Sequence, residues 1–280
     1  MIVTVKTALS AATKKLDAIP GVDAFVEANI LLAHTLDKPR SWLFAWPEHD
    51  LSEDKLDQFN RFIQRRTQGE PISYITGKRE FYSLELKVST NTLIPRHETE
   101  LLVDSAFEFV QQPQAMVLEL GTGTGAITAA LATKKPGWNF MTTDIREETL
   151  EIARFNFDKF HLEVQTILSD WFRNVPPQRF DLIISNPPYI ESNDLHLQQG
   201  DLRFEPQLAL ASGPDGLDAI RQITSECSEY LNPGGFLMLE HGYNQKTAVQ
   251  GLFKAAGLKS IETRQDLQGM DRVTIGQLSN

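Results

Sequence analysis

The spacing of apolar residues changes along the chain, and this change predicts where helices and strands lie. In the first seventy residues, apolar positions recur every three or four residues, as on one face of a helix. Ser52 is a suitable N-cap for the third of these helices and Gly69 a suitable end. We therefore predict a small helical domain over residues 1–70, built on the sets Leu9/Ala12/Leu16, Phe25/Ile30/Leu32/Leu36 and Leu56/Phe59/Phe62/Ile63.

Three aromatic residues, Trp42, Phe44 and Trp46, lie between the predicted helices. We expect them chiefly to fill the core of the helical domain. The alternative is a surface for a protein partner, because aromatic residues are enriched at protein interfaces.

A period of two replaces the helical spacing after residue 70. Apolar and charged residues alternate over 84–88, which predicts a half-buried strand. Together with Tyr74–Ile75 and a turn near Gly77–Lys78, this strand predicts a β-hairpin linker over residues 71–95.

From residue 96 onward, predicted strands and helices alternate. A helix from about Glu98 to Phe109 is followed by strands at 116–120, 140–143, 164–168, 180–185 and 236–239, helices at 126–132, 147–160, 217–231 and 245–256, and a strand pair at 261–263 and 273–275. The segment Asn232-Pro233-Gly234-Gly235 is expected to close the helix that ends at Leu231. This order predicts an α/β domain over 96–280 with a doubly wound, mostly parallel sheet and a final antiparallel strand.

Composition and charge narrow the function. The chain has 27 Lys and Arg against 37 Asp and Glu, a net charge of −10, so a tight duplex-binding protein is disfavoured. Its single cysteine, Cys227, excludes an internal disulfide, and we expect it to be a small core residue. Neither a signal peptide nor a membrane-spanning run is visible in the sequence. We therefore expect a cytoplasmic protein, and a monomer.

A glycine-rich segment follows the first strand of the α/β domain. Glu119 and Leu120 precede Gly121-Thr122-Gly123-Thr124-Gly125, which opens a helix. The second and third glycines are two residues apart, whereas a dinucleotide-binding loop needs three. The spacing resembles motif I of the S-adenosylmethionine-dependent methyltransferases. An acidic side chain at Glu119 would favour the cationic amino and sulfonium groups of that cofactor. The alternative is an ordinary glycine-rich turn.

Acidic and aromatic residues end the next two strands. Asp144 lies 19 residues after Gly125, where a carboxylate can accept hydrogen bonds from ribose hydroxyls. It would also suit an N-cap for the helix that starts near Glu147. Asp170 and Trp171 end the third strand, where a carboxylate and an indole suit an adenine. The alternative for Trp171 is core packing.

The most specific motif is Asn186-Pro187-Pro188-Tyr189, directly after a predicted strand. The prolines stop the strand and hold a rigid turn. The Asn186 side-chain oxygen and the Pro187 carbonyl can accept the two N–H bonds of a planar amino group, and Tyr189 can pack on that group. Methyl transfer to such a nitrogen needs alignment rather than a strong base. We therefore assign the tetrapeptide to catalysis and substrate binding, and place Asn186 at the cofactor as well.

Three further segments extend the resemblance. They are Arg96-His97-Glu98-Thr99-Glu100, the stretch from Glu70 to Gly77, and Phe204-Glu205-Pro206 with Asp215-Gly216-Leu217. With the tetrapeptide, they resemble the release factor glutamine methyltransferases, the HemK/PrmC family, over about residues 20–280. His97 replaces the usual proline of the family, and Glu119 its more usual aspartate.

The resemblance implies a class I, Rossmann-like methyltransferase. It would use S-adenosylmethionine, release S-adenosylhomocysteine and methylate the side-chain amide nitrogen of the glutamine in the Gly-Gly-Gln motif of peptide chain release factors. The helical domain has a separate, nearly neutral composition and precedes the hairpin linker, and a single glutamine offers little contact area to a protein partner. We therefore predict that the helical domain contacts the protein substrate.

Three alternatives remain open. An N6-adenine DNA or RNA methyltransferase shares the tetrapeptide, but residues 191–215 hold five acidic residues against Arg203 alone, which disfavours direct nucleic-acid contact. The others are a glutamine methyltransferase of a ribosomal protein and a binding module that retains the fold. The six histidines lack the i, i+4 spacing of a helical metal site, so we predict no metal.

Overall fold

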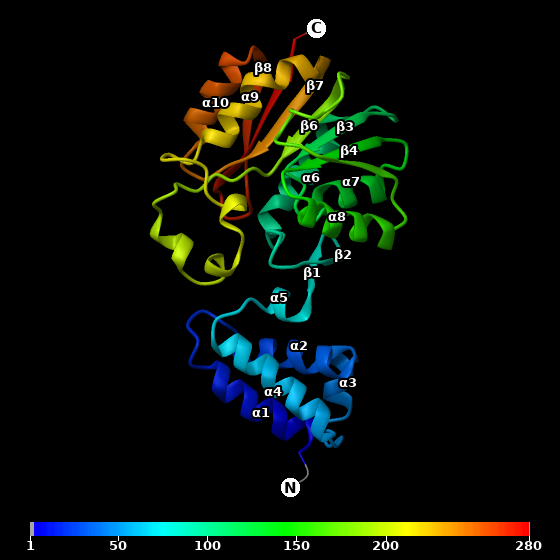
Figure 1. Cartoon of the computed structure of the whole chain (residues 1–280), viewed down its shortest axis with the longest axis vertical. Coiled ribbons are helices and arrows are strands. Elements are labelled where there is room, and N and C mark those ends of the chain that lie inside the picture. Colours follow the sequence, from blue (N-terminus) through cyan, green and yellow to red (C-terminus); the bar gives the residue numbers. More distant parts are fainter. Residues whose placement is uncertain (1–2, 280) are drawn as a thin grey trace. The chain divides into compact units, whose positions relative to one another are not determined.

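The computed structural model describes residues 3–279 and divides into two units (Figure 1). One unit runs up to Gly77 and includes residues 199–204, and the other contains Lys78–Gln198 and the chain from Glu205 onward. Each unit has its own hydrophobic core.

The first unit is helical, as predicted. Its helices are α1 (Val5–Leu16), α2 (Ala24–Leu36), α3 (Arg40–Ala45), α4 (Glu53–Thr67) and α5 (Ile72–Thr76). The apolar face of each long helix contributes to one core, in which Leu16, Leu31 and Phe59 are fully buried. The Ser52 side chain caps α4 by accepting from the Lys55 amide, which confirms the expected helix start.

The aromatic residues after α2 differ from their prediction. Trp42 and Phe44 lie within the short helix α3 and not between helices. Trp42 is half-buried and its ring meets His49 edge-on, but Phe44 and Trp46 are each 59% exposed. The expectation of core filling is therefore wrong for two of the three residues. In α3, Leu43 turns toward the bundle and its neighbour Phe44 turns away from it, and Trp46 lies at the C-cap, after the helix has ended.

Segment 199–204 packs on the first unit through polar contacts. Arg203 donates to the Gln68 carbonyl at 2.8 Å, and Asp201 lies 3.6 Å from the Arg66 guanidinium. Arg66 itself is 6% exposed and makes a two-pronged ion pair with Glu27. A loop that follows Asn186-Pro187-Pro188-Tyr189 in sequence thus belongs structurally to the helical unit.

The predicted hairpin is present, with a different first strand and turn. Its strands are β1 (Lys78–Phe81) and β2 (Leu84–Lys87), joined through Tyr82 and Ser83, which both have positive φ. Tyr74 and Ile75, expected in a strand, lie in helix α5, which Gly77 ends in the left-handed conformation. A five-residue helix is too short to show a helical period in the sequence, so its apolar residues resemble those of a short strand.

The second unit contains a seven-stranded sheet in the order β5-β4-β3-β6-β7-β9-β8. Its strands are β3 (Met116–Leu120), β4 (Asn139–Asp144), β5 (Val164–Leu168), β6 (Phe180–Ser185), β7 (Leu231–Glu240), β8 (Leu258–Gln265) and β9 (Asp271–Leu278). Strand β9 runs antiparallel to both of its neighbours, and the other pairs are parallel. This topology confirms the predicted fold class.

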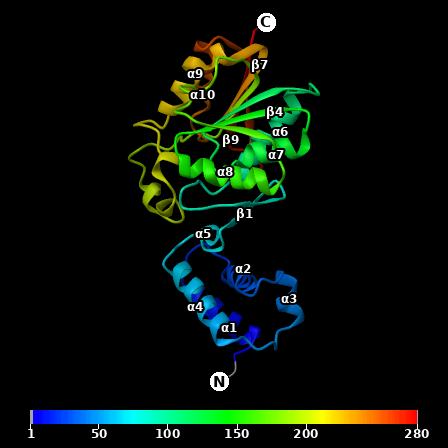
Figure 2. The same cartoon turned by 45° about the vertical axis from the view of Figure 1, so that its right-hand side comes forward.

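Helices cover both faces of the sheet (Figure 1 and Figure 2). One face packs against α6 (Glu100–Phe109), α7 (Ala126–Lys134) and α8 (Glu147–Lys159), and the other against α9 (Asp218–Tyr230) and α10 (Lys246–Ala255). The period of two decides which core each strand residue enters. Leu182 and Ile184 lie in the core between the sheet and helices α6, α7 and α8. Ile183 lies in the core between the sheet and helices α9 and α10.

Two smaller expectations have different outcomes. Cys227 is fully buried on α9, which confirms it as a core residue. The segment 232–235, expected to close the preceding helix, lies inside β7, which already begins at Leu231. The pairing of β7 with β6 shifts register there, so the proline and glycines sit at an irregularity in the strand.

Candidate active site

The carboxyl ends of four parallel strands open onto one cavity. Strands β3, β4, β5 and β6 end at Leu120, Asp144, Leu168 and Ser185, and the segments after them meet at the same edge of the sheet. The cavity has a volume of about 370 Å³, within the range of small-molecule sites. Its lining includes Glu119, Gly121, Thr122, Gly123, Thr124, Asp144, Asp170, Trp171, Asn186, Pro187 and Pro188.

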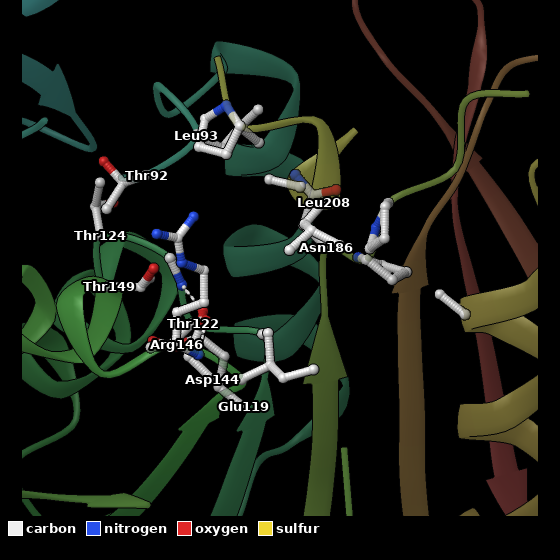
Figure 3. A pocket seen from close by; sticks show the side chains of 18 of the residues that line it. Thr92, Leu93, Glu119, Thr122, Thr124, Asp144, Arg146, Thr149, Asn186 and Leu208 are labelled. Carbon is white, nitrogen blue, oxygen red and sulfur yellow. Dashed lines mark hydrogen bonds between the residues drawn. The ribbon is translucent and has the colours of Figure 1, made fainter. Parts of the chain in front are cut away.

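Most of the residues assigned from the sequence thus lie in the lining, although the lining also contains many others. Two of the residues assigned from the sequence, Gly125 and Tyr189, are not among the described residues that line the cavity. Figure 3 shows Glu119 and Asp144 close together, with Asn186 and Leu208 on one side of the cavity and Thr124 and Thr149 on the other.

The glycine-rich segment connects β3 to α7. Gly121, Gly123 and Gly125 all have positive φ, at 68°, 57° and 78°. At Gly125, the N-cap of α7, a Cβ atom would also lie 2.7 Å from the Phe157 ring. Only glycine allows both this backbone conformation and the close packing of α8 on α7.

Glu119 lies under this loop and is 1% exposed. Its Oε2 accepts from the hydroxyls of Thr122 and Thr128, at 2.8 and 2.5 Å. Burial raises the pKa of this carboxyl to about 7, although the threonine hydrogen bonds oppose the shift. Glu119 therefore stabilises the loop through these hydrogen bonds and also lines the cavity with an acidic group.

Asp144 joins the end of β4 to the same loop. Its Oδ2 accepts from the Gly123 amide at 3.0 Å, and its Oδ1 from the Arg146 amide at 3.2 Å. Burial raises its pKa above the usual value, and the backbone hydrogen bonds oppose that shift. The alternative role as an N-cap is wrong, because the N-cap of α8 is Arg146.

Trp171 follows β5 in a strained conformation. Its φ of 47° is unusual for a bulky residue. Its indole lies against Gly121, where a Cβ atom would be 3.5 Å away. Trp171 therefore has both predicted roles: it lines the cavity, and it packs against the core between the sheet and helices α9 and α10. Asp170 lines the cavity beside it.

Hydrogen bonds from three other segments of the chain hold the tetrapeptide after β6. Asn186 Nδ2 donates to Thr99 Oγ1 at 3.0 Å, and the Tyr189 hydroxyl bonds to Glu240 Oε1 at 3.2 Å. The Tyr189 carbonyl accepts from Gln245 Nε2 at 2.9 Å. Burial raises the pKa of Tyr189, so this phenol stays protonated at neutral pH.

The segments singled out around the tetrapeptide form its framework. Glu205, whose side chain is fully buried, accepts from the Ile94 amide at 2.9 Å and pairs with the Arg96 guanidinium. Gly216 approaches the Tyr189 carbonyl so closely that a Cβ atom would overlap it. His97, in place of the family proline, has a largely exposed side chain 3.6 Å from Glu100.

Several lining residues escaped the sequence analysis, among them Arg146, Thr149 and Leu208. They lie on α8 or the loop after β6, where the sequence has no distinctive motif. Among residues 3–279, no group of three or more histidine, cysteine or acidic side chains is placed to hold a metal ion. No helix in the same range is long and apolar enough to cross a membrane.

Two family models match the chain. The model described as PrmC N-terminal domain matches residues 7–77, and the model described as Methyltransferase small domain matches residues 97–201. A solved methyltransferase from Pyrococcus furiosus is 20% identical, with a TM-score of 0.54 over 79% of this chain and 99% of that one. A 16S rRNA methyltransferase of T. thermophilus, in complex with AdoMet and guanosine, has a TM-score of 0.50 at 18% identity, over 72% of this chain and 49% of that one. These likenesses show the fold.

Curated relatives cover nearly the whole chain. A release factor glutamine methyltransferase of Vibrio cholerae is 44% identical over 99% of this chain and 98% of its own. The corresponding enzymes of Aliivibrio fischeri and Pseudomonas aeruginosa are both 45% identical, over 90% and 91% of this chain and 89% and 92% of theirs. On this similarity, the chain belongs to the family of release factor glutamine methyltransferases.

Proposed function

We propose that this protein methylates the side-chain amide nitrogen of the glutamine in the Gly-Gly-Gln motif of peptide chain release factors, with S-adenosylmethionine as methyl donor. The observation that carries the proposal is the arrangement of the cavity. Asn186, Pro187 and Pro188 line it, and the glycine-rich loop lies across the cavity from Asn186 (Figure 3). Family membership favours this reading over the adenine and ribosomal-protein alternatives.

The residues of the cavity fit the proposed cofactor. Two carboxyls, buried Glu119 and half-buried Asp144, lie beside a loop whose backbone can approach a ligand closely. We propose that Asp144 accepts from the ribose hydroxyls, that Glu119 favours the cationic end, and that Asp170 and Trp171 hold the adenine. The bound cofactor supplies an electrophilic methyl group on its sulfonium.

The chain's own residues then orient the substrate nitrogen. An amide nitrogen is a poor nucleophile because its lone pair is delocalised. Two acceptors, Asn186 Oδ1 and the Pro187 carbonyl, would bind its two N–H groups, and the rigid prolines hold these acceptors in place before binding. Catalysis would come from this alignment, without a strong base. We further propose that the protein acts as a monomer in the cytoplasm.

Label transfer tests the proposed function directly. The protein is incubated with labelled S-adenosylmethionine and either a release factor or its variant with alanine at the Gly-Gly-Gln glutamine. We expect label in the first and background counts in the second. Equal label in both proteins, or label in a DNA, RNA or ribosomal protein sample alone, would contradict the proposal.

Replacement of Asp144 is expected to weaken cofactor binding. Asp144→Ala removes a charged acceptor and also frees the Gly123 amide, so we expect the Kd for S-adenosylmethionine to rise by about 10- to 100-fold. Titration calorimetry measures this change. Asp158→Ala, at an exposed aspartate of α8, is the matched control and should keep the wild-type Kd. An unchanged Kd for Asp144→Ala would restrict Asp144 to a structural role.

We further propose that the helical unit binds the body of the release factor. A single glutamine on a loop offers little contact area, so specificity for one protein requires a second surface. Phe44 and Trp46 are both 59% exposed, and Phe25, which is 48% exposed, lies 6.3 Å from Phe44 between ring centroids. Exposed aromatic residues of this kind are typical anchors of protein interfaces.

Removal of these side chains is expected to weaken the binding of whole release factor and to leave turnover of a short peptide unchanged. For the double variant Phe44→Ser and Trp46→Ser, we expect the KM for whole release factor to rise at least about tenfold. The rate on a short Gly-Gly-Gln peptide should stay at the wild-type level. Phe155→Ser, at an exposed aromatic residue of the second unit, serves as control. A KM within twofold of wild type would remove Phe44 and Trp46 from the docking surface.

A further inference from the structure

A buried glutamine precedes α10, outside the motifs that the sequence analysis singled out. Gln245 is 8% exposed and lies at the N-cap of this helix. Its side chain makes no capping hydrogen bond within the described part of the chain, and glutamine is not a preferred N-cap residue. Burial of a side-chain amide is unfavourable unless its polar atoms are hydrogen-bonded. The hydrogen-bond partners of Gln245 therefore indicate what this side chain does.

The Gln245 amide joins three stretches of the second unit. Its Nε2 donates to the Tyr189 carbonyl at 2.9 Å and to the Asp215 carbonyl at 3.3 Å. Its Oε1 accepts from the Gly242 amide at 2.8 Å. A primary amide has two N–H donors and an acceptor oxygen, so each of these groups has a main-chain partner. In the reversed orientation, the oxygen would face two carbonyls and the nitrogen would face an N–H group, so the partners allow only one orientation.

The contact at Tyr189 is important for the turn because two prolines precede this residue. Pro187 and Pro188 have no amide hydrogen, so their nitrogens cannot donate a hydrogen bond that would hold the turn. Hydrogen bonds instead hold Asn186 on one side of the prolines and the Tyr189 carbonyl on the other. Because each proline fixes its own φ angle, a displacement of Tyr189 is transmitted to the Pro187 carbonyl.

Tyr189 contributes to the site through its main chain. It is not among the described residues that line the cavity, and its hydroxyl bonds to buried Glu240. Gly216 leaves room for the contact of its carbonyl with Gln245, since a Cβ atom at 216 would overlap the Tyr189 carbonyl and lie 2.8 Å from Gln245 Nε2. The amide of Gln245 and the absence of a side chain at 216 together define the place of this carbonyl.

We propose that Gln245 is a positioning residue for the methyl transfer. Its amide fixes the Tyr189 carbonyl, and the rigid prolines pass this constraint on to the Pro187 carbonyl, one of the two acceptors for the substrate amide. The inference rests on the proposed function for the role of Pro187. Catalysis by alignment is sensitive to displacements of about 1 Å, so a side chain that does not touch the substrate can control the rate.

Kinetics separate this role from a contribution to stability. Gln245→Met keeps the approximate size of the side chain and removes both its donors and its acceptor. We expect kcat on release factor to fall at least about tenfold, because the Pro187 carbonyl loses its alignment. The KM for release factor and the Kd for S-adenosylmethionine should stay within twofold of wild type. A loss of stability alone would leave the kcat of the folded protein unchanged.

Gln250→Met is the matched control on the same helix. Gln250 is half-buried, and its Nε2 donates to Thr263 Oγ1 of β8 at 2.9 Å. We expect this variant to lose stability in thermal unfolding and to keep the wild-type kcat. A kcat of Gln245→Met within twofold of wild type, or an equal loss of kcat in both variants, would overturn the proposal.

A second measurement does not depend on the substrate. The pair Tyr-Ile occurs at 74–75 and at 189–190, so protein with ¹³C-carbonyl tyrosine and ¹⁵N isoleucine gives one correlated NMR signal from each pair. Tyr74 lies in α5, and its signal is the internal reference. Loss of a hydrogen bond changes the chemical shift of a carbonyl carbon. Gln245→Met should therefore move the Tyr189 signal and leave the Tyr74 signal in place.

The two measurements distinguish the failure of this inference from the failure of the proposed function. An unmoved Tyr189 signal in Gln245→Met would contradict the positioning role, whatever the activity. If the signal moves as expected but the wild type labels no release factor, the proposed function fails and the anchoring of the tetrapeptide by Gln245 stands.

Discussion

Asn186→Ala is expected to abolish methyl transfer while the affinity for S-adenosylmethionine stays nearly unchanged. The variant removes the acceptor proposed to orient the substrate nitrogen, but keeps the proline turn, the glycine-rich loop and Asp144. Loss of one preorganised hydrogen-bonding group in an active site costs about 3 kcal/mol in the transition state, which is a factor of about 100 in rate. Single-turnover kinetics with release factor, together with calorimetry of the cofactor, measure the two effects separately.

The control for this variant lies in the same segment. Asn193 is an exposed asparagine seven residues further along the chain, and Asn193→Ala should retain the wild-type rate. Asn186→Ala also leaves Thr99 without the amide that it accepts from, so folding is checked by thermal unfolding. If folded Asn186→Ala retains more than about a tenth of the wild-type rate, Asn186 does not have the assigned role.

Gly216→Ala is expected to lower kcat at least about 100-fold through the backbone of the tetrapeptide. Gly216 has a φ of 73°, and a Cβ atom there would overlap the Tyr189 carbonyl and lie 2.8 Å from Gln245 Nε2. The carbonyl is backbone and cannot rotate away, so Tyr189 and the adjoining prolines must move. Displacement of aligned groups by about 1 Å can cost a factor of about 100 in rate.

Gly269→Ala separates this overlap from the strain of positive φ. Gly269 has a φ of 77°, and nothing lies within 4 Å of the position of its Cβ atom. Both variants therefore have the same unfavourable backbone conformation, worth about 1–2 kcal/mol, but only Gly216→Ala has the clash. We expect Gly269→Ala to lose stability and retain its kcat. Equal kcat values for the two variants would show that the contact between Gly216 and Tyr189 is unimportant for turnover.

Local pattern predicted the regular part of the fold. Apolar residues at a period of two place alternate side chains of a strand in different cores, as the neighbours Ile183 and Ile184 do. The same pattern could not identify α3 or α5, because helices of six and five residues are too short to show a period. For the same reason it could not show which side of α3 faces solvent, and therefore that Phe44 is exposed.

The sequence by itself determined the edge of the sheet at which the candidate site lies. The carboxyl ends of parallel strands lie at the same edge of a sheet, so the residues after β3, β4, β5 and β6 had to meet there. The chemical type of each residue could be taken from its own segment of the sequence. Only the tertiary structure decided what holds them. Asn186 is hydrogen-bonded to Thr99 and Tyr189 to Glu240, although the partners are far apart in sequence and belong to a loop, a 3-10 turn and a strand end. Their contacts depend on the order of strands in the sheet and on the packing of the turn before α6, and no local pattern of residues contains that information.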